Sequence, residues 1–229
     1  MRYISDFISL IFPRICAGCG NSLWKNEEVI CQFCEHHLPK TNFHLDPENP
    51  VTRIFWGRVR VETGTAFLYF NKGGVVQRLV HQLKYKGRKD IGIFLGSRYG
   101  LSLKDSPGFN SADLIVPVPL HRKKFTKRGY NQSEQFAIGL AGTMEIPVNT
   151  HLVARIKATE TQTRKSRFTR YQNVKEIFSV DSPQNWRGKH LVIVDDVITT
   201  GATLESCIQA LNAIPEVRIS VVCIAAAMI

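Results

Sequence analysis

An apolar run that leads into two aspartates and a loop of small residues constrains the fold of this chain most strongly. Residues 191–194 read Leu-Val-Ile-Val, which is typical of a strand buried on both faces of a parallel sheet. Asp195 and Asp196 lie where that strand is expected to end. Beyond the loop, apolar residues recur at helical spacing, at Leu204, Cys207, Ile208 and Leu211. A helix is therefore predicted to begin near Thr203.

The loop between this strand and this helix has the composition of an anion site. It consists of Thr199, Thr200, Gly201, Ala202 and Thr203, and is called the Thr-Gly loop below. The first N–H groups of a helix have no intrahelical partner, and the helix dipole adds partial positive charge. Glycine lets the backbone approach a phosphate closely, and threonine hydroxyls can donate to it. A polar loop that merely joins a core strand to a core helix is the alternative interpretation.

Asp195 and Asp196, the acidic pair, would repel a phosphate in this loop unless they bind another group. Sugar hydroxyls suit them, and so does a Mg²⁺ ion that holds a diphosphate. The segment has neither the Gly-x-x-x-x-Gly-Lys-Ser/Thr pattern of a Walker A loop nor the Gly-x-Gly-x-x-Gly pattern of a dinucleotide site. The residues therefore indicate a phosphate ligand that also carries sugar hydroxyls or a magnesium-bound diphosphate.

Four of the six cysteines form two Cys-x-x-Cys pairs, Cys16 with Cys19 and Cys31 with Cys34. Two such pairs on either side of a short loop suit tetrahedral Zn²⁺, because each pair presents two thiolates from one tight turn. Four thiolates leave no position for a substrate, so the expected zinc is structural. A disulfide framework and an iron–sulfur cluster are the alternatives.

The remaining cysteines and the nearby histidines are expected to have no role in chemistry. Cys207 and Cys223 lie in apolar segments and are interpreted as small core residues. His36, His37 and His44 follow the cysteine pairs and are interpreted as surface residues.

A net charge of +11 and a pI near 9.6 favour anionic ligands such as diphosphates, nucleotides or nucleic acid. The apolar fraction of 44% and the charged fraction of 21% are ordinary for a soluble globular protein. No apolar run approaches the roughly 20 residues needed to span a bilayer. Residues 1–13 are expected to form an amphipathic helix docked on the body, with a signal peptide as the alternative. The expected location is the cytoplasm.

Strands that alternate with helices predict an α/β fold with a mainly parallel sheet. Two domains are expected: residues 1–48, an N-terminal helix with the zinc module, and residues 49–229, divided into a hood (50–110) and a core (111–229). Residues 46–50, with two prolines, are interpreted as a linker. Strands are expected within 59–70, 114–119, 148–156, 177–180, 191–194 and 217–225, and helices within 75–83 and 91–103 and after Asn131.

Three basic segments are candidates for anion binding. Residues 120–129 are interpreted as a basic loop, and residues 159–171 as a mobile one. A diphosphate needs donors on both sides, and a closing loop would exclude water from the site. A third cluster, Arg78, Lys84, Lys86, Arg88 and Lys89, fits a solvated helix face as well as an anion-facing one. A solvated basic surface or a nucleic-acid footprint is the alternative for the two loops.

Residues 191–206 resemble the phosphoribosyl-pyrophosphate (PRPP) motif of type I phosphoribosyltransferases. Three further features resemble the ComF family of phosphoribosyltransferase-like proteins. They are residues 116–122 (Val-Pro-Val-Pro-Leu-His-Arg), residues 128–133 (Arg-Gly-Tyr-Asn-Gln-Ser), and a four-cysteine module after Phe12-Pro13-Arg14. Gln162, Arg170, Asn173 and Phe178 fit the spacing of that family's linking loop. The resemblance implies the type I phosphoribosyltransferase fold and a link to DNA uptake in natural competence.

The resemblance also implies roles for individual residues. Asp195 and Asp196 would address the ribose hydroxyls, and the Thr-Gly loop would hold the 5′-phosphate. Pyrophosphate would be bound by Pro119, Leu120, His121 and Arg122 on one side and by Arg164, Lys165 and Arg167 on the other. Mg²⁺ would enter together with PRPP.

Two main functions remain open at this stage. The first is an enzyme that transfers ribose 5-phosphate from PRPP to an acceptor nitrogen and releases pyrophosphate. The second is a non-catalytic adaptor that keeps the PRPP fold and binds single-stranded DNA or DNA-uptake proteins. A PRPP-sensing regulator is a third hypothesis, although the sequence contains no helix-turn-helix motif.

Overall fold

The computed structural model describes residues 12–156 and 177–227. The predicted helix at 1–13 and the basic loop at 159–171 lie almost wholly outside the described residues. Helices and strands follow one another in the order α2 (Gln32–His36), η1 (Phe43–Leu45), α3 (Pro50–Arg53), β1 (Thr63–Tyr69), α4 (Val75–Tyr85), α5 (Lys89–Leu103), β2 (Leu114–Pro117), α6 (Arg122–Arg128), α7 (Gln132–Met144), β3 (Val153–Ile156), β4 (Ile177–Val180), η3 (Pro183–Trp186), β5 (His190–Ile198), α8 (Ala202–Leu211) and β6 (Arg218–Ala226).

The main sheet has four strands in the order β1-β6-β5-β2, and each neighbouring pair is parallel. Strand β5 lies in the interior of the sheet between β6 and β2, with Ile193 opposite Val221 on one side and Val116 on the other. Strands β3 and β4 form a separate antiparallel pair. The predicted α/β fold with a mainly parallel sheet is confirmed.

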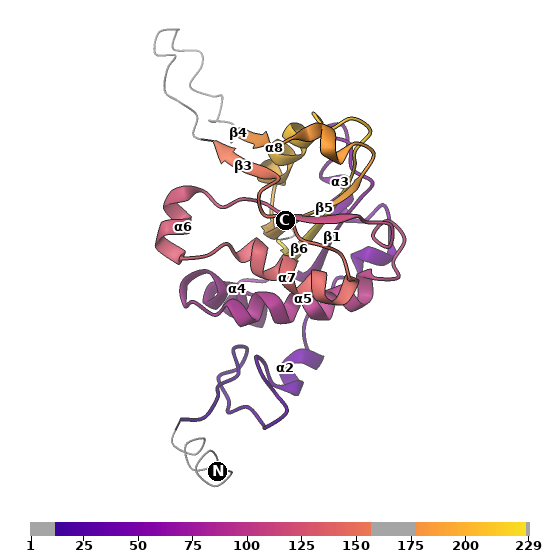
Figure 1. Cartoon of the computed structure of the whole chain (residues 1–229). Helices are drawn as coiled ribbons and strands as arrows, with labels where there is room; N and C mark the ends of the chain where they lie inside the picture. Colours follow the sequence, from indigo (N-terminus) through magenta and orange to yellow (C-terminus); the bar gives the residue numbers. More distant parts are fainter. Residues whose placement is uncertain (1–11, 157–176, 228–229) are drawn as a thin grey trace, which may run out of the picture.

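Helices cover both faces of the main sheet (Figure 1). Val192 and Val194 of β5 belong to the apolar cluster that contains the buried residues of α4, α5 and α7. Leu191 and Ile193, which point to the opposite face, belong to the cluster that contains the buried residues of α8. Because both faces of β5 are buried at residues 191–194, these four positions are apolar, which explains the run that the sequence shows.

Helices α5 and α7 approach each other through glycines. A Cβ atom added at Gly96 would lie 2.2 Å from the carbonyl oxygen of Phe136, and one added at Gly139 would lie 2.1 Å from that of Ile93. The opposing backbone cannot yield as a flexible side chain would. This contact therefore fixes α7 on α5, and with it the first turn of α7, which faces the acidic pair.

The acidic pair lies inside β5 rather than after it, which corrects the predicted strand end. Strand β2 stops at Pro117, opposite Val194, whereas β6 continues alongside β5 as far as Ala226, opposite Ile198. Pairing with β6 carries β5 four residues beyond the apolar run. Asp195 and Asp196 thus lie where β5 has lost its neighbour on the β2 side.

Residues 148–156 do not form the single predicted strand. Val148 makes one parallel bridge with Ile115, and only Val153–Ile156 is a strand, β3. Between them, the Asn149 side chain accepts hydrogen bonds from the N–H groups of His151 (2.8 Å) and Leu152 (2.9 Å). This local turn competes with strand extension and breaks the segment.

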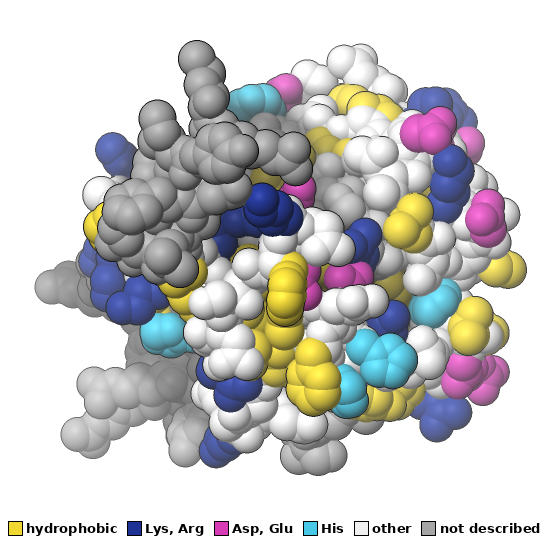
Figure 2. All heavy atoms as spheres, turned by 90° about the horizontal axis from the view of Figure 1, so that it is seen from below, with side chains coloured by type: hydrophobic (Ala, Val, Ile, Leu, Met, Phe, Trp, Pro, Cys, Tyr) yellow, Lys and Arg dark blue, Asp and Glu magenta, His cyan; other side chains and the backbone are white. Residues whose placement is uncertain are grey.

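The predicted basic loop at 120–129 contains a helix, α6. The His121 side chain accepts a hydrogen bond from the N–H of Lys123 at its start, and Gly129 ends it in the left-handed conformation with φ 76°. None of its residues is buried. Figure 1 shows α6 projecting from the body, and Figure 2 shows Lys and Arg side chains gathered at the left edge, on the side where α6 lies. The basic charge of this segment is therefore exposed.

The predicted linker at 46–50 is hydrogen-bonded to β1 of the main sheet. The amide of Asn49, which is 1% exposed, caps α3 and donates to the carbonyl oxygen of Gly64 in β1 at 2.7 Å. Upstream, Lys40 makes an antiparallel bridge with Leu68 at the outer edge of β1. Strand β1, which lies in the predicted hood, is thus part of the main sheet, and the division at residue 48 remains a prediction. In the part of the chain that the structure describes, no helix has the length and apolar character needed to cross a membrane.

Candidate functional site

The acidic pair is held by hydrogen bonds at the carboxyl-terminal half of β5. The Ser133 hydroxyl, in the first turn of α7, donates to Oδ1 of Asp195 at 3.0 Å. The backbone N–H of Asp196 donates to the same oxygen at 2.8 Å, and the N–H of Val197 donates to Oδ1 of Asp196 at 2.6 Å. Hydrogen bonds within the protein therefore orient both carboxyl groups.

Lys84, in the last turn of α4, binds the second carboxylate of the pair. Its Nζ lies 2.9 Å from both Oδ1 and Oδ2 of Asp196, and the two side chains are only 21% and 16% exposed. Asp196 thus has a cationic partner supplied by the chain itself.

Asp195 is half-buried and has a strongly raised pKa. Burial raises its pKa from an ordinary 3.8 to about 7, and the neighbouring charge of Asp196 acts in the same direction. Hydrogen bonds from the Asp196 N–H and from Ser133 oppose the rise. A carboxyl group of this kind gains from a ligand that brings hydroxyl donors or positive charge.

The Thr-Gly loop follows β5 and leads into α8. Gly201 caps the helix with φ 75°, and a Cβ atom at this position would lie 2.6 Å from Cγ2 of Ile54. Glycine is therefore required by the left-handed backbone and by the contact with Ile54, rather than by close approach of a phosphate alone. Asp195, residues 197–198 and the loop together with Leu204 line a small cavity of about 70 Å³.

Arg58 joins this loop to its surroundings. One guanidinium nitrogen donates to the carbonyl oxygen of Thr200 at 2.9 Å and to that of Ile54 at 3.2 Å, and another pairs with the carboxylate of Glu205 in α8. Thr199, Thr200 and Ala202 are exposed, Thr203 is half-buried and Gly201 is buried. Arg58 thus supports a loop in which Thr199, Thr200 and Ala202 are exposed.

The segment predicted to bind pyrophosphate follows β2, beside β5. Pro119, Leu120 and His121 are half-buried and Arg122 is exposed. The N–H of Val118 donates to the carbonyl oxygen of Val194 at 2.9 Å, and the Asn131 side chain donates to the carbonyl oxygen of Val118 at 2.9 Å. These bonds place the start of the segment beside the β5 residue that precedes Asp195. Arg164, Lys165 and Arg167 lie outside the described residues.

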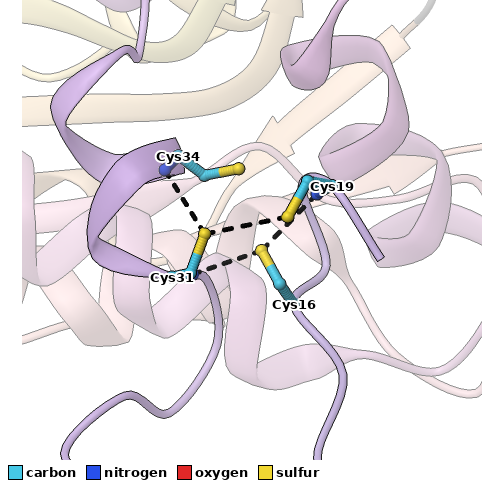
Figure 3. A group of neighbouring side chains, drawn as sticks. All are labelled: Cys16, Cys19, Cys31 and Cys34. Carbon is cyan, nitrogen blue, oxygen red and sulfur yellow. Dashed lines mark hydrogen bonds between the residues drawn. The ribbon is translucent and has the colours of Figure 1, made fainter. Parts of the chain in front are cut away.

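The four paired cysteines form one cluster with their sulfur atoms turned toward one another (Figure 3). All four Sγ atoms lie within 4.8 Å of one another, and those of Cys19 and Cys31 are 3.7 Å apart. Zinc bound at about 2.3 Å by each of four sulfurs separates them by about 3.8 Å in a tetrahedron. The cluster therefore has the ligands and the dimensions to hold a metal ion such as zinc.

Backbone amides surround the sulfur of Cys16. The N–H groups of Gly18, Cys19 and Cys31 donate to it at 3.3, 3.5 and 3.2 Å. Burial opposes ionisation, but these donors lower the pKa of the Cys16 thiol to about 6. A Cβ atom at Gly18 would lie 2.9 Å from the sulfur of Cys34. Gly18 therefore presents its amide to one sulfur and leaves room for another.

The cysteine module, residues 12–38, docks on α4 and α5. Arg78 donates to the carbonyl oxygen of Gly18 at 2.7 Å, and Gln82 donates to that of Ala17 at 2.7 Å. Arg98 of α5 pairs with Glu35 of α2 at 2.6 Å. The loop between the first two cysteines is thereby joined to the helix that carries Lys84.

The sequence did not identify Lys84, Ser133 or Arg58 as residues of the site. Lys84 lies in the basic cluster for which a solvated face and an anion-facing role fitted equally well, and the structure directs it to Asp196. Ser133 belongs to the Arg-Gly-Tyr-Asn-Gln-Ser segment, but a serine in a first helical turn is common without such a role. No local signal marks Arg58, which contacts the Thr-Gly loop from a distant part of the sequence.

Cys207 and Cys223 are 0% exposed, which confirms that they are core residues. Burial raises the pKa of the Cys207 thiol to about 12, so it does not act as a thiolate nucleophile. His36 and His37 are exposed as predicted, but His44 is half-buried with its ring edge against Tyr99. The prediction for His44 was wrong because η1, which contains it, packs against Tyr99 of α5.

The chain is similar to one known domain family and to several known bacterial proteins. The family described as phosphoribosyl transferase domain matches residues 131–228. DNA utilization protein YhgH of Escherichia coli strain K12 is 31% identical over 205 residues, covering 86% of this chain and 83% of that protein. Competence protein F of Haemophilus influenzae is 33% identical over 138 residues, covering 58% and 60%. Competence protein ComFC of Bacillus subtilis is 24% identical over 199 residues, covering 86% and 78%.

Proposed function

The chain belongs to the ComF family of phosphoribosyltransferase-like proteins, and on this premise we propose that it binds PRPP and transfers ribose 5-phosphate to an acceptor nitrogen. The observation that carries the proposal is the acidic pair beside the Thr-Gly loop. Two carboxyl groups with fixed orientation adjoin an exposed loop at the start of a helix, at the carboxyl edge of a parallel sheet. Ligands of α/β proteins bind at that edge.

In this proposal each part of the site addresses one part of the ligand. Asp195 and Asp196 accept hydrogen bonds from the ribose hydroxyls. Residues 199–203 donate backbone and hydroxyl hydrogen bonds to the 5′-phosphate. Residues 119–122 lie on the diphosphate side, with Arg122 as the charged donor. Arg164, Lys165 and Arg167 are proposed to complete the diphosphate site from the opposite side.

The reaction breaks the bond between the anomeric carbon and the diphosphate oxygen and forms a bond from that carbon to the acceptor nitrogen. The electron pair of the broken bond leaves with pyrophosphate, and the nitrogen loses a proton. The residues act by positioning and by charge, since the carboxylates stabilise the positive charge that develops on the sugar. When bound with PRPP, Mg²⁺ neutralises the diphosphate.

The cysteine cluster is proposed to hold one structural Zn²⁺ ion. Cys16, Cys19, Cys31 and Cys34 supply a complete tetrahedral set and leave no open position. The zinc would stabilise the module and the loop that docks on α4, away from the chemistry of the acidic pair.

A non-catalytic adaptor that acts on DNA is the second candidate function. Helix α6 favours it, because Lys123, Lys124 and Lys127 are exposed and Phe125 between them is 48% exposed. Basic residues with an interleaved aromatic ring suit single-stranded nucleic acid. The relatives are named for DNA utilization and competence, and a link to DNA uptake is proposed on that ground.

Ligand-dependent unfolding and pyrophosphate release distinguish the two functions. With Mg²⁺ present, PRPP should raise the melting temperature of the wild type, because it binds only the native state. Asp196→Asn should lose most of that shift, whereas Asp181→Asn, at an exposed position after β4, should keep it. Release of pyrophosphate with candidate nitrogen acceptors supports the enzyme. PRPP binding without release, together with salt-dependent binding to single-stranded DNA, supports the adaptor. No shift with PRPP contradicts PRPP binding and with it the enzyme, and the DNA measurement alone then tests the adaptor.

A further inference from the structure

We propose that Lys84 is a further residue of the PRPP site. Its ammonium pairs with Asp196 in the structure and moves to the diphosphate when PRPP binds. This inference rests on the proposed function, and it adds a residue that neither the sequence motifs nor the family match contains. The matched family segment begins at residue 131, whereas Lys84 comes from α4.

The first step of the argument is the geometry of the ion pair. Lys84 Nζ lies 2.9 Å from each oxygen of Asp196, and both side chains are largely buried. An exposed lysine–aspartate pair contributes little to stability and needs no function. Here the ammonium is withdrawn from solvent and engages both oxygens of a residue that the proposal assigns to the sugar.

The second step is the way in which Lys84 is held in place. The Tyr130 hydroxyl donates to the carbonyl oxygen of Leu83, the residue before Lys84. Gln82, two residues before Lys84, donates to the carbonyl oxygen of Ala17 at 2.7 Å. A cation in the last turn of a helix is also favoured by the helix dipole. The backbone of Lys84 is therefore fixed, while its four-carbon side chain keeps the freedom to turn.

The third step is the chemistry of the ligand. If the acidic pair binds the hydroxyls of the ribose, the diphosphate lies on the next carbon, because it is attached to the anomeric position. Sugar hydroxyls donate to Asp196 and take over the lone pairs that Lys84 occupies. The released ammonium then lies beside the most negatively charged part of the ligand, to which it can donate charged hydrogen bonds. This exchange also resolves the repulsion between the acidic pair and an incoming phosphate.

The test compares two ligands that differ in the diphosphate. Binding of PRPP and of ribose 5-phosphate to the full chain is measured by calorimetry at one Mg²⁺ concentration, for the wild type, Lys84→Met, Lys84→Arg and Lys86→Met. Lys86 is exposed at the end of the same helix and serves as the control for charge. Lys84→Met should lower the affinity for PRPP by about 10- to 100-fold and the affinity for ribose 5-phosphate by less than about 3-fold. Lys84→Arg should restore part of the PRPP affinity, and Lys86→Met should behave as the wild type.

Each other outcome overturns the proposal in a distinct way. An equal loss for both ligands shows that Lys84 acts only by positioning Asp196. Unchanged binding in Lys84→Met shows that the ion pair serves the fold alone. If Lys84→Met does not fold, Lys84→Arg decides, since equal affinity changes for both ligands again contradict the diphosphate contact. A wild type that binds neither ligand refutes the proposed function itself, whereas a wild type that binds PRPP with unaffected variants refutes only the role of Lys84.

Discussion

Replacing Gly201 by alanine should destabilise the protein through a contact behind the Thr-Gly loop. The residue has φ 75° and is the cap of α8, and its new Cβ atom would lie 2.6 Å from Cγ2 of Ile54. The left-handed backbone alone costs an L-residue about 1–2 kcal/mol. Forcing a methyl group into a packed contact costs a further ~1–3 kcal/mol. The expected loss of unfolding free energy is therefore about 2–5 kcal/mol.

Gly188 provides the matched control. Its φ is 68°, and a Cβ atom there would have nothing within 4 Å. Gly188→Ala should thus show the backbone cost alone, about 1–2 kcal/mol. Both substitutions change the unfolded chain in the same way, so the difference between them measures the contact with Ile54.

The assay is urea unfolding of Gly201→Ala, Ile54→Ala, the double variant and Gly188→Ala. In the Ile54→Ala background the methyl group that meets the new Cβ is absent, so the cost of Gly201→Ala should fall to that of Gly188→Ala. The reasoning is refuted if Gly201→Ala and Gly188→Ala cost the same, or if Ile54→Ala gives no coupling. Because the added Cβ faces Ile54, folded Gly201→Ala should still show a rise in melting temperature with PRPP.

Three further predictions follow from the cysteine cluster, the acidic pair and the helix contact. Protein purified without chelator should contain about one zinc per chain, and Cys31→Ser should make the first forty or so residues protease-sensitive; metal loss without new cleavage there would contradict a structural site. Asp195 has a pKa of about 7 in the fold against an ordinary 3.8, so the folded state binds the extra proton between these values. Stability of the ligand-free wild type relative to Asp195→Asn should therefore fall by up to about 1.4 kcal/mol per unit as pH rises from 4 to 7, and parallel pH profiles in urea unfolding would show that Asp195 titrates normally. Gly139→Ala should cost more than about 2 kcal/mol because its Cβ meets the Ile93 carbonyl oxygen at 2.1 Å, whereas Gly142→Ala in the same helix, with nothing within 4 Å, should be neutral or stabilising; equal effects would contradict the close backbone contact.

The sequence predicted those parts of the fold in which local pattern and burial agree. Residues 191–194 are apolar because both faces of β5 are covered there. A run of four apolar residues shows this burial in the sequence itself. The end of β5 was not predictable, because it depends on β6 continuing as far as Ala226. A pairing of this kind joins residues far apart in the chain. Helix α6 was missed because a seven-residue basic helix without an apolar face has no periodic signal.

In the candidate site, too, features set by local sequence could be predicted and features set by tertiary contacts could not. The cysteine cluster could be proposed from spacing, since each Cys-x-x-Cys pair is local and only one loop must close to bring the pairs together. Lys84 could not be proposed as a partner of Asp196, which lies 112 residues away in the chain. Its charge was visible, but its direction is set by the packing of α4 against the module and the sheet. The contact that requires glycine at position 201 could not be predicted either, because Ile54 belongs to a distant segment of the sequence.

Helix α4 also joins two sites that the chain keeps far apart in sequence. Its 11 residues span about 16 Å, with Arg78 and Gln82 bound to the cysteine loop and Lys84 bound to the acidic pair. If two ligands both bind the chain only when this helix is docked, their binding is thermodynamically coupled. Such coupling is reciprocal. For the proposed zinc and PRPP sites, the factor by which zinc changes the affinity for PRPP must equal the factor by which PRPP changes the affinity for zinc.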